Sequence, residues 1–134
     1  MSAKGPIFIL SIDGGGSRGV IPANILYHLE HDAAIAVRKS FDFFTGVSTG
    51  AMIAAYLARN AGSVERLATE SYSAENLSRI MDKTVWDKML GRMQNQPKYD
   101  GVNKRAYAAD LLNDSRINDI EDKHLLILAY DFIN

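Results

Sequence analysis

Residues 7–19 read IFILSIDGGGSRG, a short apolar run that breaks on three consecutive glycines. Residues 41–50 read FDFFTGVSTG, a second apolar run that ends in a serine enclosed by glycines. Each stretch is typical of a strand that turns sharply into a helix, because glycine permits backbone turns that larger residues resist. We call residues 13–19 the glycine turn and residues 46–50 the serine turn. One carries a row of backbone amides and the other a hydroxyl.

Strands and helices are expected to alternate along the rest of the chain. Apolar runs predict three buried strands at 6–12, 41–46 and 125–133, with both faces of the first covered. Helical spacing predicts helices from 22 to about 37, over 51–61, from a capping box at Ser63, within 74–93 and over 102–113. This alternation predicts an α/β fold, a three-layer sandwich with a mostly parallel central sheet and helices on both faces.

Composition restricts the classes of function. The 134 residues fit one domain, and a formal charge of −1 gives no reason to expect a nucleic-acid partner. The absence of cysteine excludes disulfides, thiolate metal sites and a cysteine nucleophile. No apolar run approaches the ~20 residues that cross a bilayer, and the N-terminus makes a poor signal peptide. We therefore expect a cytoplasmic protein.

The chain stops directly after its last apolar run, at Asn134. A three-stranded parallel sheet ending there would leave a hydrophobic edge unpaired, which proteins normally avoid. We expect residues 1–134 to form the N-terminal part of a single larger domain, or another segment to cover the edge. An uncovered edge would favour self-association.

The serine turn has the spacing Gly-x-Ser-x-Gly, from Gly46 through Ser48 to Gly50. In this pattern the two glycines let strand and helix approach closely around a strained, exposed serine. The hydroxyl then lies at the carboxyl end of the sheet, where the helix dipole favours developing negative charge. The pattern predicts Ser48 as a catalytic nucleophile.

The glycine turn has two interpretations. Its glycines at 14, 16 and 19 match a dinucleotide fingerprint, which also needs an acid about twenty residues on. Asp32 has that spacing but falls inside a predicted helix. The alternative is an oxyanion hole, in which the amides of Gly14, Gly15 and Gly16 face Ser48. Arg18 would add a positive charge there, and we favour this second interpretation.

Together, DGGGSRG at 13–19 and GVSTG at 46–50 resemble the N-terminal half of a patatin-like phospholipase domain. KYDG at 98–101 before a short helix, and the last strand, are similar to the family in the same order. The resemblance implies a lipid acyl hydrolase that attacks a phospholipid or related lipid ester, at a membrane surface, without metal or organic cofactor. It implies a Ser–Asp dyad with Ser48 as nucleophile, Gly15 and Gly16 in the oxyanion hole, and Arg18 assisting.

The sequence departs from the family pattern at the base. The family aspartate lies in a separate Asp-Gly-Gly or Asp-Gly-Ala motif well beyond the point where this chain stops, and the Asp13-Gly14 pair of this chain already belongs to the glycine turn. Asp100 precedes a glycine but matches a different part of the pattern, where a turn is the simpler interpretation. Asp131 lies on the last predicted strand with no turn after it. We therefore expect the base to lie beyond Asn134 and these residues alone to be inactive.

Several alternatives stay open. His28 or His31 could act as the base instead, although solvated helix histidines are the simpler interpretation. The apolar spacing of Trp86, Met89, Leu90 and Met93 fits either a lipid-facing segment or, as we prefer, a core helix. Rival functions are another serine esterase or transacylase, a non-catalytic module that binds lipid or a partner, and a nucleotide-binding domain.

Overall fold

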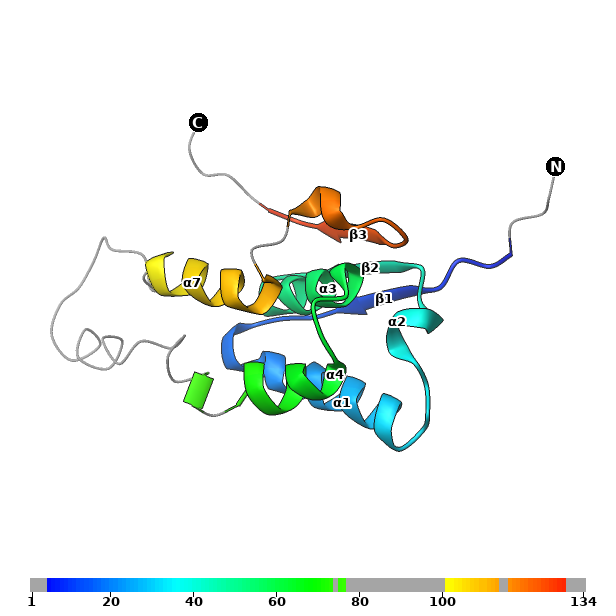
Figure 1. Cartoon of the computed structure of the whole chain (residues 1–134), viewed down its shortest axis with the longest axis horizontal. Helices are drawn as coiled ribbons and strands as arrows, with labels where there is room; N and C mark the ends of the chain where they lie inside the picture. The colour runs from blue at the N-terminus through cyan, green and yellow to red at the C-terminus, as the bar shows by residue number, and fades with distance from the viewer. Residues whose placement is uncertain (1–4, 74, 77–100, 114–115, 130–134) are drawn as a thin grey trace, which may run out of the picture.

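The computed structural model describes residues 5–73, 75–76, 101–113 and 116–129 (Figure 1). Its strands are β1 (Ile9–Ile12), β2 (Phe43–Gly46) and β3 (His124–Ile127). Its helices are η1 (Gly16–Gly19), α1 (Val20–His31), α2 (Val37–Ser40), α3 (Thr49–Arg59), α4 (Val64–Arg66), η2 (Leu67–Ser71), α7 (Gly101–Leu112) and η3 (Ile117–Asp119). Apart from residues 75–76, the predicted helices within 74–93, with Trp86, lie outside the described residues, and so does the end of the last predicted strand.

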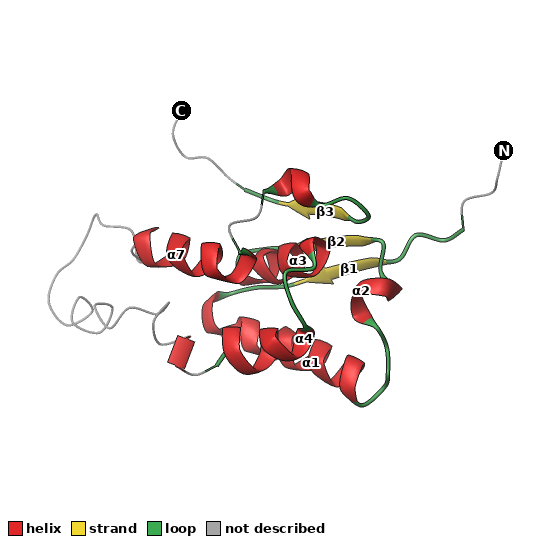
Figure 2. Ribbon diagram, viewed as in Figure 1, coloured by secondary structure: helices red, strands yellow, loops and turns green. Residues whose placement is uncertain are grey.

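The strands form one parallel sheet in the order β1-β2-β3, which confirms the predicted α/β class. In the register of this sheet Ile12 lies opposite Gly46, and Gly46 lies opposite Ile127. All three strands therefore end at the same edge (Figure 2). The glycine turn and the serine turn leave the sheet side by side at this carboxyl edge.

Helix α3 packs on one face of the sheet and forms the centre of the core. Its alanine-rich sequence allows close approach, and Ile53, Ala54 and Tyr56 are fully buried. The strand side chains beneath it, Ile12 and Phe44, are 4% and 0% exposed. This face was predicted correctly, because short apolar strands followed by an alanine-rich helix favour this packing.

The opposite face is open within the described part of the chain. Ile9 on β1 is 59% exposed and Leu126 on β3 is 48% exposed. The prediction that the strand at 6–12 is covered on both faces is therefore wrong within the described part of the chain. The hydrophobic core collects on the α3 side, and both exposed residues lie outside it.

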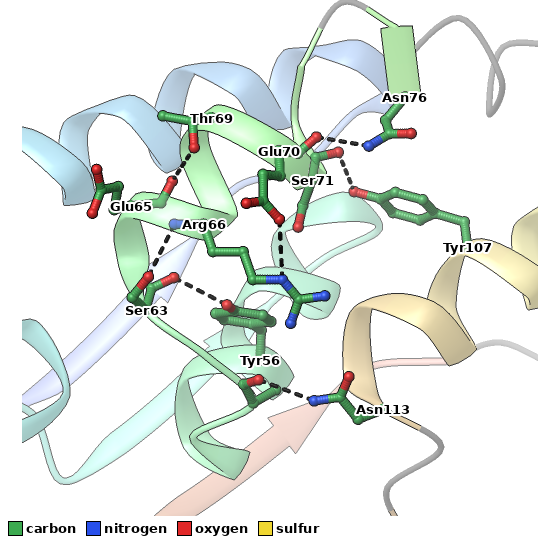
Figure 3. Close-up of polar contacts among 11 residues, drawn as sticks. Tyr56, Ser63, Glu65, Arg66, Thr69, Glu70, Ser71, Asn76, Tyr107 and Asn113 are labelled. Carbon is green, nitrogen blue, oxygen red and sulfur yellow. Dashed lines mark hydrogen bonds and ion pairs between the residues drawn. The ribbon is translucent and has the colours of Figure 1, made fainter.

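The helix boundaries differ from the sequence pattern in physically explicable ways. Helix α1 ends at His31 rather than near residue 37, and Ala34 then has a φ of 54°. Such a left-handed residue cannot continue a right-handed helix. By contrast the cap predicted at Ser63 is confirmed, because the Arg66 amide donates to Ser63 Oγ at 3.1 Å (Figure 3).

Two hydrogen bonds fasten α7 to the segments that follow α3 (Figure 3). The Tyr107 hydroxyl donates to the Ser71 carbonyl at 2.8 Å. The Asn113 side-chain amide donates to the Ala61 carbonyl at 3.0 Å. The first of these bonds holds α7 against η2, and Tyr72, the residue after η2, donates a hydrogen bond to the serine turn.

Candidate active site

Ser48 lies between β2 and α3 with the dihedral angles φ 56° and ψ −125°. Residues with a side chain rarely adopt this conformation, and it persists only where the surroundings enforce it. Ser48 is the N-cap residue of α3, yet its side chain makes no capping hydrogen bond. It is also exposed. A strained backbone thus presents a hydroxyl that the helix start does not use.

The glycines of the serine turn are needed for close backbone packing. A Cβ added at Gly50 would lie 2.1 Å from the Ile12 carbonyl oxygen. A Cβ added at Gly46 would lie 2.5 Å from the Gly50 carbonyl oxygen. Both contacts are closer than real Cβ atoms tolerate. The structure therefore has the tight strand-to-helix geometry that the Gly-x-Ser-x-Gly spacing predicts.

The glycine turn lies directly against the serine turn. A Cβ at Gly14 would lie 1.9 Å from the Val47 carbonyl oxygen and 2.8 Å from the Thr49 amide nitrogen. The backbones are in contact although the sequence separates them by more than 30 residues. This adjacency is what an oxyanion hole formed by one turn for a nucleophile on the other requires.

The amides of the glycine turn differ in their partners. The Gly15 amide donates to Thr49 Oγ1 at 3.0 Å. Among the described residues, the amides of Gly14 and Gly16 have no hydrogen-bond acceptor. Thr49 was not among the predicted site residues, because its hydrogen-bond partner lies 34 residues away in the sequence.

Arg18 lies beside the same turn. A Cβ at Gly15 would lie 3.3 Å from Arg18 Nε and 3.4 Å from Arg18 Nη2, so the guanidinium group folds back over Gly15. The Arg18 amide also donates to the Gly15 carbonyl at 3.2 Å. The Arg18 guanidinium therefore places a positive charge beside the backbone of the glycine turn.

Tyr72 contacts the serine turn, and Tyr107 packs against Tyr72. Tyr72 is 1% exposed, and its hydroxyl donates to the Thr49 carbonyl at 3.3 Å. Its ring packs edge-on against Tyr107 and so closely on Gly19 that a Cβ there would lie 2.4 Å away. Burial raises the pKa of Tyr72, and it raises the pKa of Tyr107 to about 12. Both hydroxyls therefore stay protonated donors near neutral pH.

The histidines do not join this site. His28 and His31 lie in the last turn of α1, roughly 12 Å or more along the helix from Val20. Their Nδ1 atoms contact the Asp32 carboxylate at 2.7 and 2.8 Å, and these hydrogen bonds lower the pKa of Asp32. His124 begins β3 opposite Phe43, at the amino edge of the sheet.

Asp32 does not complete a dinucleotide fingerprint either. It caps the end of α1, whereas the fingerprint needs an acid after the second strand. Within the described ranges, no three acidic or histidine side chains are grouped to bind a metal ion. No described helix is long and apolar enough to span a bilayer.

A polar cavity of about 460 Å³ lies at the other end of α3. Its lining includes Arg38, Arg59 and Asp122. Since α3 starts at the carboxyl edge of the sheet and runs away from it, this cavity is separate from the serine turn.

Comparison with known proteins supports one assignment. The family model described as patatin-like phospholipase matches residues 10–131. Patatin-like protein 2 of Oryza sativa subsp. indica is 35% identical over 144 residues, covering 96% of this chain and 35% of that protein. Probable inactive patatin-like protein 9 of Arabidopsis thaliana is 27% identical over 92% of this chain and 35% of its own length.

A shorter match is to a human protein. Calcium-independent phospholipase A2-gamma of Homo sapiens is 50% identical over 48 residues, 36% of this chain and 6% of that protein. No solved structure is a significant match. The chain spans about a third of the length of the first plant relatives it matches.

Proposed function

The chain belongs to the patatin-like phospholipase family, and on that premise we propose that it carries the nucleophile and oxyanion loop of a serine lipid acyl hydrolase of the phospholipase A type. One observation carries the proposal: Ser48 is held in a strained turn, against the glycine turn, with a hydroxyl that its helix does not use. The substrate is a phospholipid or related lipid ester at a membrane surface. That substrate class is supported by relatives named as phospholipases A2.

In the proposed reaction Ser48 Oγ attacks the ester carbonyl carbon while its proton passes to a base. Following the resemblance to the family, we assign the base to an aspartate outside residues 1–134; none of the three described histidines lies near the serine turn to take that role. The tetrahedral oxyanion accepts hydrogen bonds from the Gly14 and Gly16 amides, with the Arg18 charge beside them. The alcohol leaves with a proton, and water then hydrolyses the acyl-serine to release the fatty acid.

A non-catalytic role is the second candidate. One relative is named as inactive, and within the described residues β1 and β3 are outer strands with unpaired edges. Such a module would bind lipid or self-associate through an edge, and it would hydrolyse nothing. Another serine esterase or a transacylase would share the same two turns, so a panel of ester substrates and acyl acceptors separates those reactions. The cytoplasmic location stays a prediction.

The test is covalent labelling of the full-length protein with a fluorophosphonate probe, together with release of fatty acid from phosphatidylcholine vesicles. Wild-type protein should be labelled and should hydrolyse the lipid, and Ser48→Ala should lose at least about 10⁴-fold in rate. Ser63→Ala is the matched control, because Ser63 also begins a helix but uses its hydroxyl as a cap. Equal labelling of Ser48→Ala and wild type would overturn the proposal.

A further inference from the structure

Thr49 forms the hydrogen bond that connects the two turns. Its Oγ1 accepts from the Gly15 amide at 3.0 Å, across a sequence separation of 34 residues. Within the described part of the chain, this is the one hydrogen bond between residues 13–18 and residues 46–50. Gly14, Gly15 and Gly16 have no side chains of their own to bond the serine turn, so this bond is expected to help fix their position.

Thr49 is itself held firmly. It is the first residue of α3 and is 8% exposed. The Tyr72 hydroxyl donates to its carbonyl oxygen, and its Cβ lies under Gly19. The Thr49 hydroxyl is therefore a fixed acceptor, while Gly15 and Gly16, with φ values of 150° and 57°, belong to a segment with many accessible conformations.

We propose that Thr49 is a positioning residue for hydrolysis: its hydroxyl holds the Gly15 amide and so directs the neighbouring Gly14 and Gly16 amides toward the oxyanion formed at Ser48. The proposal rests on the proposed function. It assigns Gly15 a structural role, because an amide already bonded to Thr49 is not free to bind the oxyanion. It also explains why a threonine, with an acceptor on a stiff side chain, follows the nucleophile here.

A positioning role predicts a particular kinetic effect. Misplacing the amides weakens the transition state, in which the negative charge is fully developed, more than it weakens substrate binding. Misplacement of about 1 Å can cost on the order of 10²-fold in rate. Loss of the Thr49 hydroxyl should therefore lower kcat and leave KM nearly unchanged.

The experiment compares Thr49→Val, which removes the acceptor at similar volume, with Thr49→Ser, which keeps it. In the full-length protein, Thr49→Val should lower kcat on a 4-nitrophenyl acyl ester by about tenfold to a hundredfold, with KM within about twofold. Thr49→Ser should restore kcat to within about threefold of wild type, because serine has the same acceptor. The thermal midpoint of each variant is measured alongside, and Thr49→Ala replaces Thr49→Val if the latter does not fold.

The outcomes separate this inference from the proposed function. If Ser48→Ala keeps wild-type activity, the proposed function fails and this inference fails with it. If Ser48→Ala is inactive but Thr49→Val keeps the wild-type kcat, the function stands and the inference is overturned. A serine variant as slow as the valine variant, or an effect confined to KM, also overturns it, since either result would indicate methyl packing or substrate contact.

Discussion

The two ends of α3 use their polar groups in opposite ways. At the carboxyl end, Arg38 donates from Nε to the Leu57 carbonyl at 3.0 Å and from Nη2 to the Ala58 carbonyl at 3.3 Å. Asp122 accepts two further hydrogen bonds from the same guanidinium group. At the amino end, Ser48 makes no side-chain cap, and the amides of Gly14 and Gly16 beside it have no acceptor within the part of the chain that the structure describes.

The difference separates a structural end from a candidate functional one. Helix termini leave backbone groups without intrahelical partners, and proteins normally satisfy them with side chains. Here the Arg38 side chain bonds carbonyls of the carboxyl end, whereas at the amino end the Gly50 and Ala51 amides bond backbone carbonyls and the Ser48 hydroxyl makes no cap. The polar cavity lined by Arg38, Arg59 and Asp122 lies at the carboxyl end of α3 and not at the serine turn.

The largest change in the free energy of unfolding is expected at the contact between the glycine turn and the serine turn. Gly14→Ala places a Cβ 1.9 Å from the Val47 carbonyl oxygen, and it should lower the free energy of unfolding by about 3 kcal/mol or more. Urea denaturation measures the change. Gly16→Ala is the control, because φ is 57° and no atom lies within 4 Å of its Cβ, so only about 1–2 kcal/mol should be lost. Similar losses for both variants would contradict the close contact of the turns.

Substitutions at the carboxyl end of α3 should lower stability without changing the reactivity of Ser48. Arg38→Met keeps the apolar stem and removes the hydrogen bonds to Leu57, Ala58 and Asp122. We expect a loss of about 1–2 kcal/mol in the free energy of unfolding. The rate of fluorophosphonate labelling at Ser48 should stay at the wild-type value. Slower labelling in folded protein would show that the two ends are coupled.

Relieving the backbone strain at Ser48 should change the free energy of unfolding by a smaller amount, and it should stabilise the protein. Ser48→Gly removes the unfavourable φ of 56°, and it should raise the free energy of unfolding by about 1 kcal/mol relative to Ser48→Ala. Thermal unfolding of the two inactive variants tests this directly. A lower midpoint for the glycine variant would mean that the backbone at this position is not strained.

The smallest expected effect is a change in how stability depends on pH, and it concerns Asp122 at the carboxyl end of α3. The hydrogen bonds from Arg38 lower the pKa of Asp122 below its ordinary value of 3.8. The resulting stability is present above the ordinary value and is lost as pH falls through the lower, folded-state pKa. Asp122→Asn should therefore flatten the fall in thermal midpoint between about pH 4 and pH 2. An unchanged slope would show that this exposed pair contributes nothing.

Local signals in the sequence were enough for the elements around the site. The glycine spacing predicted the turn at Ser48, and the serine before α4 predicted the cap at Ser63, because both depend on neighbouring residues. The Thr49–Gly15 hydrogen bond could not be predicted in this way, since it joins side chain to backbone across 34 residues. The exposure of Ile9 was also missed, because an apolar residue does not reveal which other segments cover it.

The left-handed conformation of Ser48 also bears on how this chain would change over generations. If a lineage lost the need for the reaction, selection for folding alone would favour glycine at position 48, because serine there has an energetic cost without a benefit. Replacement of this one residue would then precede the decay of the surrounding glycines, whose close contacts the fold still needs. A descendant that had become a pure binding module would then have glycine at position 48 and would keep the surrounding glycines.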